Sequence, residues 1–299
     1  MGAFLPAKTM FALVNRYYFD EKCRRKAREI YIFDANLSKC WKPHVKPTCA
    51  GIVHIRKAKE NMDNVRLIAF DLDGTLTQHK TKLAQPNLGV LNALRAKYKL
   101  LMVGAGMCSR IFSQMNGYPI DIIGNYGMQF CTYNAATGEL DHVFDEHAPC
   151  DRASVEARVT ALRERFGYTV FKGNNVEYHD SGCVTFPLLG TAADITDKLA
   201  FDPDRAKRKP MYPVVRDAFP DYTVFIGGSS SFDLAPFPYN KYYALDRYCT
   251  EYGYDHSEVV YVGDDYGPGG NDEAVYRSDF RFIRVDDYTR FGEYMKEFL

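Results

Sequence analysis

The chain has 299 residues, of which 46% are hydrophobic and 25% are charged, and its 38 Lys and Arg balance 38 Asp and Glu. This composition is typical of an ordinary globular protein with one large domain or two smaller ones. No window holds the eighteen apolar residues that a membrane span needs, which argues against a transmembrane protein. The eight cysteines include no C-x-x-C pair and no clustered histidines accompany them, so we expect reduced thiols, no zinc site and a cytoplasmic location.

The charge is unevenly spread along the chain. Residues 1–61 carry thirteen Lys and Arg against five Asp and Glu, whereas the remaining residues carry 25 against 33. We therefore expect residues 1–61 to form a separate, basic and poorly ordered N-terminal extension, with one helix over 20–31. Two alternatives stay open, namely an organelle presequence and translated sequence upstream of a start at Met62. Nucleic-acid binding is not expected, because the extension contains no recognised module.

Regular elements begin at residue 65. In chain order we expect a strand buried on both faces over 65–71, a helix and a second such strand over 87–107, a helix over 109–117 and a short strand over 121–125. Strands that alternate with helices in this way predict a doubly wound, Rossmann-like α/β sheet. Ligands bind beyond the carboxyl ends of strands in such sheets, where Asp71 and Asp73 lie.

The middle of the chain differs from its two ends. In chain order it predicts a polar helix over 150–167, strands over 168–173 and 183–189, a charged segment over 202–219 and a strand over 222–228. A helix over 240–253 and an apolar strand over 257–265 then return to the first pattern. We expect a core split by an inserted α+β module, with boundaries at 62–136 for the first core segment, 137–236 for the insertion and 237–299 for the second core segment.

Oxygen-bearing side chains follow two of the expected core strands. They are Asp71, Asp264, Asp265, Asn271 and Asp272. Clustered carboxylates repel one another, so a cation is the expected compensator, and Mg²⁺ prefers oxygen ligands. A carboxylate can also attack phosphorus to form an aspartyl phosphate, while a neighbouring acid such as Asp73 protonates the leaving alkoxide and then deprotonates the attacking water.

These residues resemble three motifs of the haloacid dehalogenase superfamily. The first motif, D-x-D-G-T-[LV]-[TS], is matched without a break by residues 71–77, and Lys241 opens a helix as the third motif requires. The fourth motif is matched by Gly263-Asp264 and Asn271-Asp272. The resemblance implies that Asp71 is the nucleophile, Asp73 the general acid and base, and Lys241 the group that balances the charge of Asp71 and the phosphoryl group. It also implies a Mg²⁺ site built from Asp71, the carbonyl of Asp73, Asp264, Asn271 and Asp272.

Within this superfamily, residues 65–299 resemble the branch of phosphatases with a type C2 (IIB) cap, and most closely the eukaryotic-type phosphomannomutases. The stretches IGGSSSFDLAPFPYNKYYAL and YVGDDYGPGGNDEAVY carry the likeness. It implies that the insertion is a mobile cap, that a small phosphorylated metabolite such as a sugar phosphate is the substrate, and that Ser231 and Asp233 line its site. A turn at a strand end is the structural alternative for these two residues. The resemblance also admits a homodimer formed through the caps.

Two departures from the phosphomannomutase pattern affect the expected reaction. The second motif normally supplies a Ser or Thr, but the matching stretch is Val103-Gly104-Ala105-Gly106-Met107, so we expect backbone N–H groups of Gly104, Ala105 and Gly106 to bind phosphate. The cap arginines that grip a second phosphate are also missing from the matching residues, 180–185 and 190–191. Asp or Thr cannot replace the bidentate grip of a guanidinium.

The expected function is therefore a Mg²⁺-dependent phosphatase that acts through an aspartyl phosphate. Two alternatives stay open: a phosphomannomutase-like hexose phosphate mutase and a catalytically silent binding protein on the same fold. A further basic run could form a different anion site, although a charge run is usually a solvated face. This run comprises Lys198, Arg205, Lys207, Arg208 and Lys209.

Overall fold

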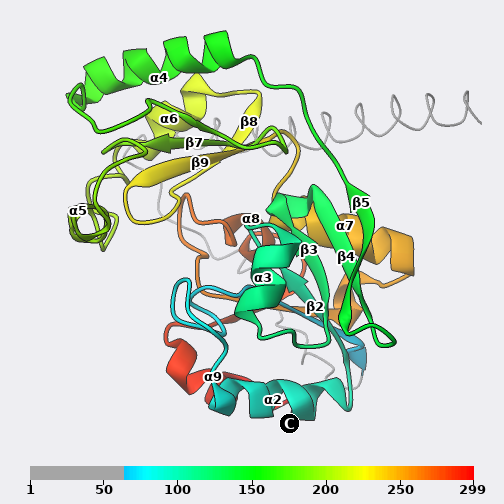
Figure 1. Ribbon diagram of the computed structural model, residues 1–299. Helices are drawn as coiled ribbons and strands as arrows, with labels where there is room; N and C mark the ends of the chain where they lie inside the picture. The colour runs from blue at the N-terminus through cyan, green and yellow to red at the C-terminus, as the bar shows by residue number, and fades with distance from the viewer. Residues whose placement is uncertain (1–63) are drawn as a thin grey trace, which may run out of the picture. The chain divides into compact units, whose positions relative to one another are not determined.

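The computed structural model describes residues 64–299 of the chain (Figure 1). The expected basic extension over residues 1–61 and its helix lie outside the described residues. Within residues 64–299, no helix combines the length and the apolar character that crossing a membrane requires.

A seven-stranded sheet forms the core (Figure 1). Its strands, in spatial order, are β11 (Arg281–Arg284), β10 (Val259–Gly263), β1 (Leu67–Phe70), β2 (Lys99–Val103), β3 (Asp121–Gly124), β4 (Gln129–Asn134) and β5 (Glu139–Asp145). The first five strands are parallel, which confirms the predicted α/β core. The last two pair antiparallel and extend one edge of the sheet.

Helices cover both faces of this sheet, because alternate residues of its central strands point to opposite sides. On β1, Ile68 and Phe70 belong to one hydrophobic cluster, whereas Leu67 and Ala69 belong to another. The first cluster includes residues of α2 (Gln85–Arg95), α3 (Cys108–Gln114) and α9 (Phe291–Tyr294). The second includes residues of α7 (Lys241–Tyr252) and α8 (Glu273–Tyr276). Burial on both faces explains why the β1 sequence is apolar throughout.

The part of the sequence between the two core segments forms a second sheet, which is antiparallel. Its strands, in spatial order, are β6 (Glu177–Tyr178), β7 (Val184–Pro187), β9 (Ser231–Pro236) and β8 (Tyr222–Phe225). Its helices are α4 (Arg152–Phe166), α5 (Ile195–Phe201) and α6 (Tyr212–Ala218). Apolar residues of α4 and α6, such as Val155 and Val215, pack against this sheet in a cluster of their own.

The expected boundary at residue 136 is wrong, because β5 pairs with β4 in the core sheet and extends the first core segment to Asp145. The strand lies at the sheet edge, and most of its residues are exposed, so it lacks the apolar pattern that would have identified it. We therefore call residues 146–236 the insertion.

The strand expected over residues 168–173 is also absent from the described structure. Val170 is 91% exposed, and the backbone turns at Gly173, whose φ is +82°. The edge of the second sheet is instead occupied by β6. The β-branched and aromatic residues of this stretch favour a strand, but in the described structure they pair with neither sheet.

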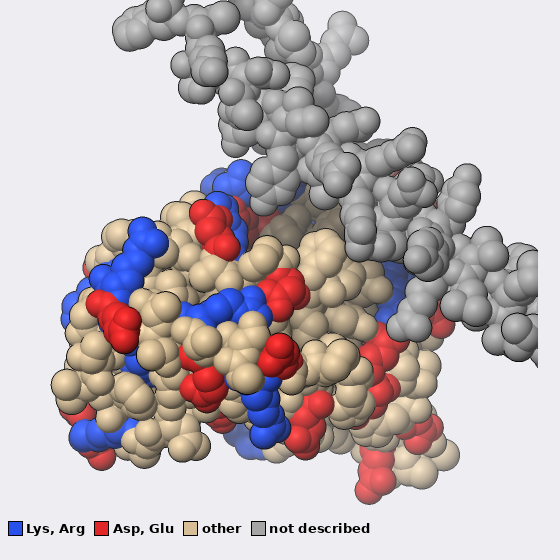
Figure 2. All heavy atoms as spheres, turned by 90° about the horizontal axis from the view of Figure 1, so that it is seen from above, with Lys and Arg blue, Asp and Glu red and all other residues tan. Residues whose placement is uncertain are grey.

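Three short 3₁₀ helices complete the described chain: η2 (Asn125–Gly127), η3 (His256–Glu258) and η4 (Tyr288–Arg290). The five cysteines in the described part of the chain are free thiols: Cys108, Cys131, Cys150, Cys183 and Cys249. Acidic and basic side chains are interspersed over the face that Figure 2 displays.

Candidate active site

The site forms where β1 and β10, two parallel neighbours, end at the same edge of the core sheet. Phe70 is paired with Val262, and the backbone N–H of Asp71 donates to the Val262 carbonyl at 2.9 Å. Asp71 therefore lies beside Asp264, which follows the last residue of β10. This register explains why two acids far apart in sequence meet at one point.

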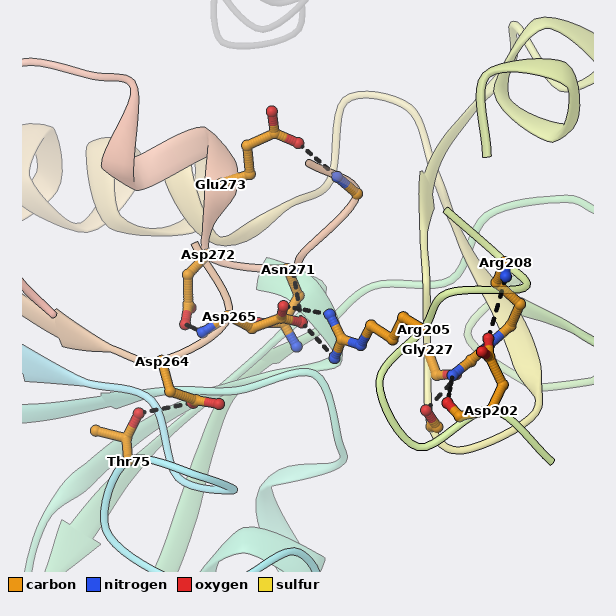
Figure 3. Close-up of polar contacts among 12 residues, drawn as sticks. Thr75, Asp202, Arg205, Arg208, Gly227, Asp264, Asp265, Asn271, Asp272 and Glu273 are labelled. Atoms are coloured by element: carbon orange, nitrogen blue, oxygen red, sulfur yellow. Dashed lines mark hydrogen bonds and ion pairs between the residues drawn. The ribbon is translucent and has the colours of Figure 1, made fainter. Parts of the chain in front are cut away.

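Three carboxylates gather at this edge. Asp71, Asp264 and Asp272 each offer an oxygen atom, and these atoms lie within 4.8 Å of one another. Thr75 Oγ1 donates to Asp264 Oδ1 at 2.9 Å and fixes this side chain (Figure 3). Gly74 leaves room for the same carboxylate, because a Cβ at residue 74 would lie 2.2 Å from Asp264 Oδ2.

Lys241 lies among the carboxylates with no exposed surface. Its Nζ is 2.6 Å from Asp71 Oδ1 and 2.8 Å from Asp272 Oδ1. Asn240 caps the helix that Lys241 opens, because its side chain accepts the N–H of Tyr243. Asp71, Lys241 and Asp264, which the sequence resemblance assigns to one site, thus lie close together.

The site carries an excess of negative charge. Burial raises the pKa of Asp71 well above its usual value, although Lys241 acts in the opposite direction. Burial and the neighbouring Asp272 raise the pKa of Asp264 to about 6. Burial alone would lower the pKa of Lys241, but Asp272 and Asp71 raise it. One ammonium group therefore does not neutralise three carboxylates, and a bound cation would favour their ionised forms.

The residues present fit a magnesium ion. Asp71 and Asp264 supply carboxylate oxygens, the donors that Mg²⁺ prefers. Asn271 Oδ1 is buried and has no hydrogen-bond partner among residues 64–299, as expected of an atom that awaits a ligand. Asp272 is more committed: its Oδ1 accepts from Lys241 and Tyr261, and its Oδ2 accepts the N–H of Asp265 at 3.0 Å. It holds Lys241 in place.

Asp73 lies in a different hydrogen-bond environment. Its Oδ1 accepts from the Lys80 N–H at 2.7 Å and from Gln114 Nε2 at 2.6 Å, and its Oδ2 lies 3.4 Å from Arg110 Nη1. Burial alone would raise the pKa of Asp73, but the hydrogen bonds from Gln114 and Lys80 and the charge of Arg110 lower it. In this state Asp73 is a carboxylate that can accept a proton.

One of the three N–H groups expected to bind phosphate in the loop after β2 is already engaged in a hydrogen bond. The N–H of Gly104, expected to bind phosphate, donates to the Ile123 carbonyl at 2.9 Å and is not free. No residue in the described range 64–299 accepts from the N–H groups of Ala105 and Gly106. The same loop contacts Arg110 of α3, a residue that the sequence did not single out.

Ser231 and Asp233 lie on β9 of the insertion. Ser231 Oγ donates to the Gly227 carbonyl at 3.2 Å, and Asp233 Oδ1 accepts from Thr185 Oγ1 at 3.2 Å. Burial raises the pKa of Asp233, while positive charges that include Lys80 of the core lower it. Asp233 therefore lies within electrostatic reach of the loop that follows Asp73.

The basic run of the insertion divides in two: Lys207 and Lys209 are exposed, whereas Arg205 and Arg208 pair with acidic side chains. Arg208 is 1% exposed, pairs with Asp202 at 2.8 Å and donates to the carbonyl of Gly227 (Figure 3). It also donates to the carbonyl of Ser231. Arg205 forms two hydrogen bonds with Asp265, the residue after Asp264. An ion pair from the insertion thus reaches the acidic loop of the core.

Residues 166–286 match the family model described as eukaryotic phosphomannomutase. The chain is 25% identical over 235 residues to a phosphomannomutase of Solanum lycopersicum, covering 70% of this chain and 84% of that protein. It is 25% identical over 249 residues to the phosphomannomutase of Encephalitozoon cuniculi, covering 79% and 95%.

Solved structures share the fold. A subclass IIB sugar phosphatase of the haloacid dehalogenase superfamily matches with a TM-score of 0.52 and 16% identity, covering 78% of this chain and 99% of that one. An IMP-nucleotidase of Plasmodium falciparum matches with a TM-score of 0.60 and 14% identity, covering 79% and 69%. In sequence, this chain is thus similar to phosphomannomutases, and it shares its fold with a sugar phosphatase of the haloacid dehalogenase superfamily.

Proposed function

We propose that the chain is a Mg²⁺-dependent phosphatase that hydrolyses a small phosphorylated metabolite, such as a sugar phosphate. One observation carries the proposal: Lys241 lies between Asp71 and Asp272, beside Asp264, at the carboxyl edge of the sheet. The relatives support the same chemistry at a coarser level, since their names describe enzymes that act on phosphate esters.

In the first step, an Oδ atom of Asp71 attacks phosphorus and forms an aspartyl phosphate, while the bond between phosphorus and the leaving oxygen breaks. Lys241 holds the attacking carboxylate and balances its charge. The phosphoryl group brings negative charge beside Asp73, which raises its pKa and lets it take up the proton that it then gives to the leaving alkoxide.

In the second step, Asp73 accepts a proton from water as the water oxygen attacks phosphorus. The bond to Asp71 breaks, so the Asp71 carboxylate is regenerated and inorganic phosphate leaves. The lowered pKa of Asp73 in the free protein supports this role as a base. Bound Mg²⁺, held by Asp71, the Asp73 carbonyl, Asp264 and Asn271, would neutralise the charge of the phosphoryl oxygens.

Water is the proposed acceptor of the phosphoryl group. The phosphomannomutase pattern places arginines for a second phosphate at residues 180–185 and 190–191, and this chain has none there. The two most buried arginines of the insertion are committed to the backbone. Arg163 is 3% exposed and donates to the carbonyls of Leu188 and Pro187, and Arg208 is fixed as described above. A mutase must hold its bisphosphate intermediate by the second phosphate while the intermediate reorients and presents its other phosphate to the nucleophile.

The insertion is proposed to act as a cap that brings Ser231 and Asp233 to the substrate. The influence of Lys80 on the pKa of Asp233 supports a position near the mouth of the site. A homodimer formed through the insertion is also proposed, on the sequence resemblance alone, and light scattering would test it.

A hexose phosphate mutase is the second candidate, because the sequence relatives are phosphomannomutases. Mutase activity would convert hexose 1-phosphates into 6-phosphates when a catalytic amount of sugar bisphosphate is added. Free phosphate without this conversion would favour hydrolysis.

The test of the proposal is phosphate release from p-nitrophenyl phosphate and from a panel of sugar, nucleotide and polyol phosphates, with Mg²⁺ and with EDTA. We expect Mg²⁺-dependent turnover in the wild type and a loss on the order of 10⁴-fold in Asp71→Asn. Absence of turnover on the whole panel would instead favour a silent binding protein.

A further inference from the structure

Asp265 holds together the acidic loop that follows β10. Its Oδ2 accepts the N–H of Asn271 at 3.2 Å. Its backbone forms two hydrogen bonds with Asp272: the Asp265 N–H donates to Asp272 Oδ2, and the Asp265 carbonyl accepts the Asp272 N–H, both at 3.0 Å. Gly270 passes so close that a Cβ there would lie 2.1 Å from the Asp265 carbonyl oxygen. The positions of Asn271 and Asp272 therefore depend on how Asp265 is held.

The side chain that holds the Asp265 carboxylate comes from the insertion. Arg205 Nη1 donates to Asp265 Oδ1, and Arg205 Nη2 donates to Asp265 Oδ2 at 3.0 Å (Figure 3). The Asp265 side chain is 14% exposed. A planar guanidinium that binds both oxygens of a carboxylate fixes its orientation as well as its charge. A residue of the insertion thus sets the orientation of a carboxylate in the core.

Arg205 is itself fixed within the insertion. Its N–H donates to the Asp202 carbonyl at 3.1 Å, and the buried pair of Asp202 with Arg208 closes the same turn. The φ of Arg205 is +60°, in the left-handed region that residues with a Cβ rarely adopt. A second bond from the insertion reaches the same acidic loop, because the Ile226 N–H donates to the Gly269 carbonyl at 2.8 Å. The guanidinium is therefore presented to Asp265 in a defined direction.

Asn271 is the metal ligand on which this contact acts. Its Oδ1 is buried and has no hydrogen-bond partner in the described part of the chain, as noted above for the Mg²⁺ site. Its backbone N–H is held by Asp265 Oδ2, the same oxygen that accepts from Arg205 Nη2. Removal of a group that orients a metal ligand typically weakens metal binding about 10- to 100-fold.

We propose that Arg205 of the insertion is a positioning residue for the Mg²⁺ site of the core, and that it acts through Asp265 on Asn271. The inference rests on the proposed function, because it concerns the metal site that the phosphatase needs. It implies that the core segments alone do not complete this site. Full Mg²⁺ affinity requires the insertion to be seated against the loop after β10, and by linkage bound Mg²⁺ favours that seating.

The sign of the effect separates positioning from charge. Without the Arg205 guanidinium, Asp265 is an additional uncompensated negative charge next to Asp264. Charge alone therefore predicts tighter Mg²⁺ binding in Arg205→Ala. Loss of the positioning contact predicts weaker binding, so the two accounts give opposite results for one variant.

The experiment measures the Mg²⁺ affinity of the full chain by calorimetry, without substrate. The variants are Arg205→Ala, Arg205→Lys, Asp265→Ala and the double variant Arg205→Ala/Asp265→Ala. Lys209→Ala is the matched control, since it removes the same charge from an exposed residue of the same segment. Urea unfolding of each variant checks that it is folded.

We expect Arg205→Ala to weaken Mg²⁺ binding about 10-fold, at the low end of the usual range because the charge effect opposes it. Arg205→Lys should lie between Arg205→Ala and the wild type, since an ammonium keeps the charge but lacks the fork. Lys209→Ala should bind like the wild type. The double variant should bind like Asp265→Ala, because Arg205 acts through Asp265.

Turnover and hydrogen exchange supply two further readouts. The Mg²⁺ concentration for half-maximal hydrolysis of p-nitrophenyl phosphate should rise in Arg205→Ala by the same factor as the dissociation constant, while kcat at saturating Mg²⁺ changes less. Addition of Mg²⁺ should slow exchange of the Ile226 amide in the wild type, and by less in Arg205→Ala, because metal binding and the seating of the insertion are linked. Equal slowing in the two proteins would contradict this linkage.

Unchanged or tighter Mg²⁺ binding in Arg205→Ala would overturn the proposal. An equal loss on removal of Arg205 with and without Asp265 would also overturn it. Mg²⁺ binding needs no turnover, so the two proposals can fail separately. Hydrolysis with unaltered Mg²⁺ affinity in Arg205→Ala would overturn this inference alone, whereas Arg205-dependent Mg²⁺ binding without hydrolysis would overturn the phosphatase proposal alone. A wild type that binds no Mg²⁺ would overturn both.

Discussion

Lys241 is the residue on which the electrostatics of the site depend. Its ammonium group has no exposed surface and is the only cation paired with Asp71 and Asp272 in the described chain. A buried ion pair adds little net stability compared with apolar residues, but removal of one partner leaves the other charges without compensation. The effect of a substitution at Lys241 should therefore exceed that of a surface lysine.

We expect Lys241→Met to lower the free energy of unfolding of the metal-free protein by about 3–5 kcal/mol, measured by urea denaturation. The control is Lys99→Met, which breaks a pair with Asp121 whose lysine is 44% exposed and should cost less than about 1 kcal/mol. Equal losses in the two variants would contradict this account of the buried cluster.

The residues around Asp73 show what a motif omits. Arg110 and Gln114 are four residues apart on α3, so they lie on the same face of the helix, and both contact Asp73. Their spacing was readable within the predicted helix over 109–117. Nothing in the sequence, however, placed that face over Asp73, because the packing of α3 on the sheet determines it.

At the scale of elements, the charged segment of the insertion forms a structural unit. The buried ion pair of Arg208 with Asp202 closes the loop between α5 and α6. From the same loop, Arg205 forms an ion pair with Asp265 of the core. A backbone bond from Ile226 of the insertion to Gly269 of the core, 2.8 Å long, contacts the same acidic loop. The insertion and the loop that follows β10 are thus linked at two points.

We expect Arg205→Ala to loosen this loop and to leave the global fold intact. Hydrogen exchange at the amides of Asn271 and Asp272 should become faster, because the Asn271 N–H donates to the Asp265 carboxylate that Arg205 fixes. The free energy of unfolding should change by less than about 1 kcal/mol, since the pair is partly exposed.

Lys209→Ala is the matched control for this measurement. It removes the same charge from the same segment, and Lys209 is exposed. Faster exchange of the two amides in both variants would mean that net charge, and not the bond to Asp265, sets the mobility of the loop.

At the scale of the whole molecule, the clustered carboxylates of the site should make the stability of the fold depend on pH. The pKa of Asp264 is raised to about 6 from an ordinary value of 3.8. Between pH 3.8 and pH 6, the unfolded chain therefore holds fewer protons at this group than the folded chain does. The contribution of Asp264 to stability is fully present below pH 3.8 and is lost as the pH rises through 6. The raised pKa of Asp71 acts in the same direction.

We expect the metal-free protein to lose on the order of 1–3 kcal/mol of stability from this cluster between pH 4 and pH 7. Saturating Mg²⁺ should remove most of this loss, because a cation favours the ionised carboxylates. Thermal unfolding at several pH values, with EDTA and with Mg²⁺, measures both effects. In Asp264→Asn the loss should become smaller, and an unchanged pH dependence in this variant would contradict the assignment.

The sequence by itself determined the parallel α/β core and the acids at its edge, because strands buried on both faces are apolar throughout and the motif residues follow directly after them. It did not identify β5, whose exposed edge position leaves no apolar pattern, and it wrongly predicted a strand over 168–173, which pairs with neither sheet of the described structure. Only the tertiary structure decided that Lys241 also pairs with Asp272, that Arg208 is buried and that Arg110 fills the space beside Gly106. The physical reason is that these contacts join segments far apart along the chain, and their geometry depends on how helices and loops pack, which local sequence patterns do not encode.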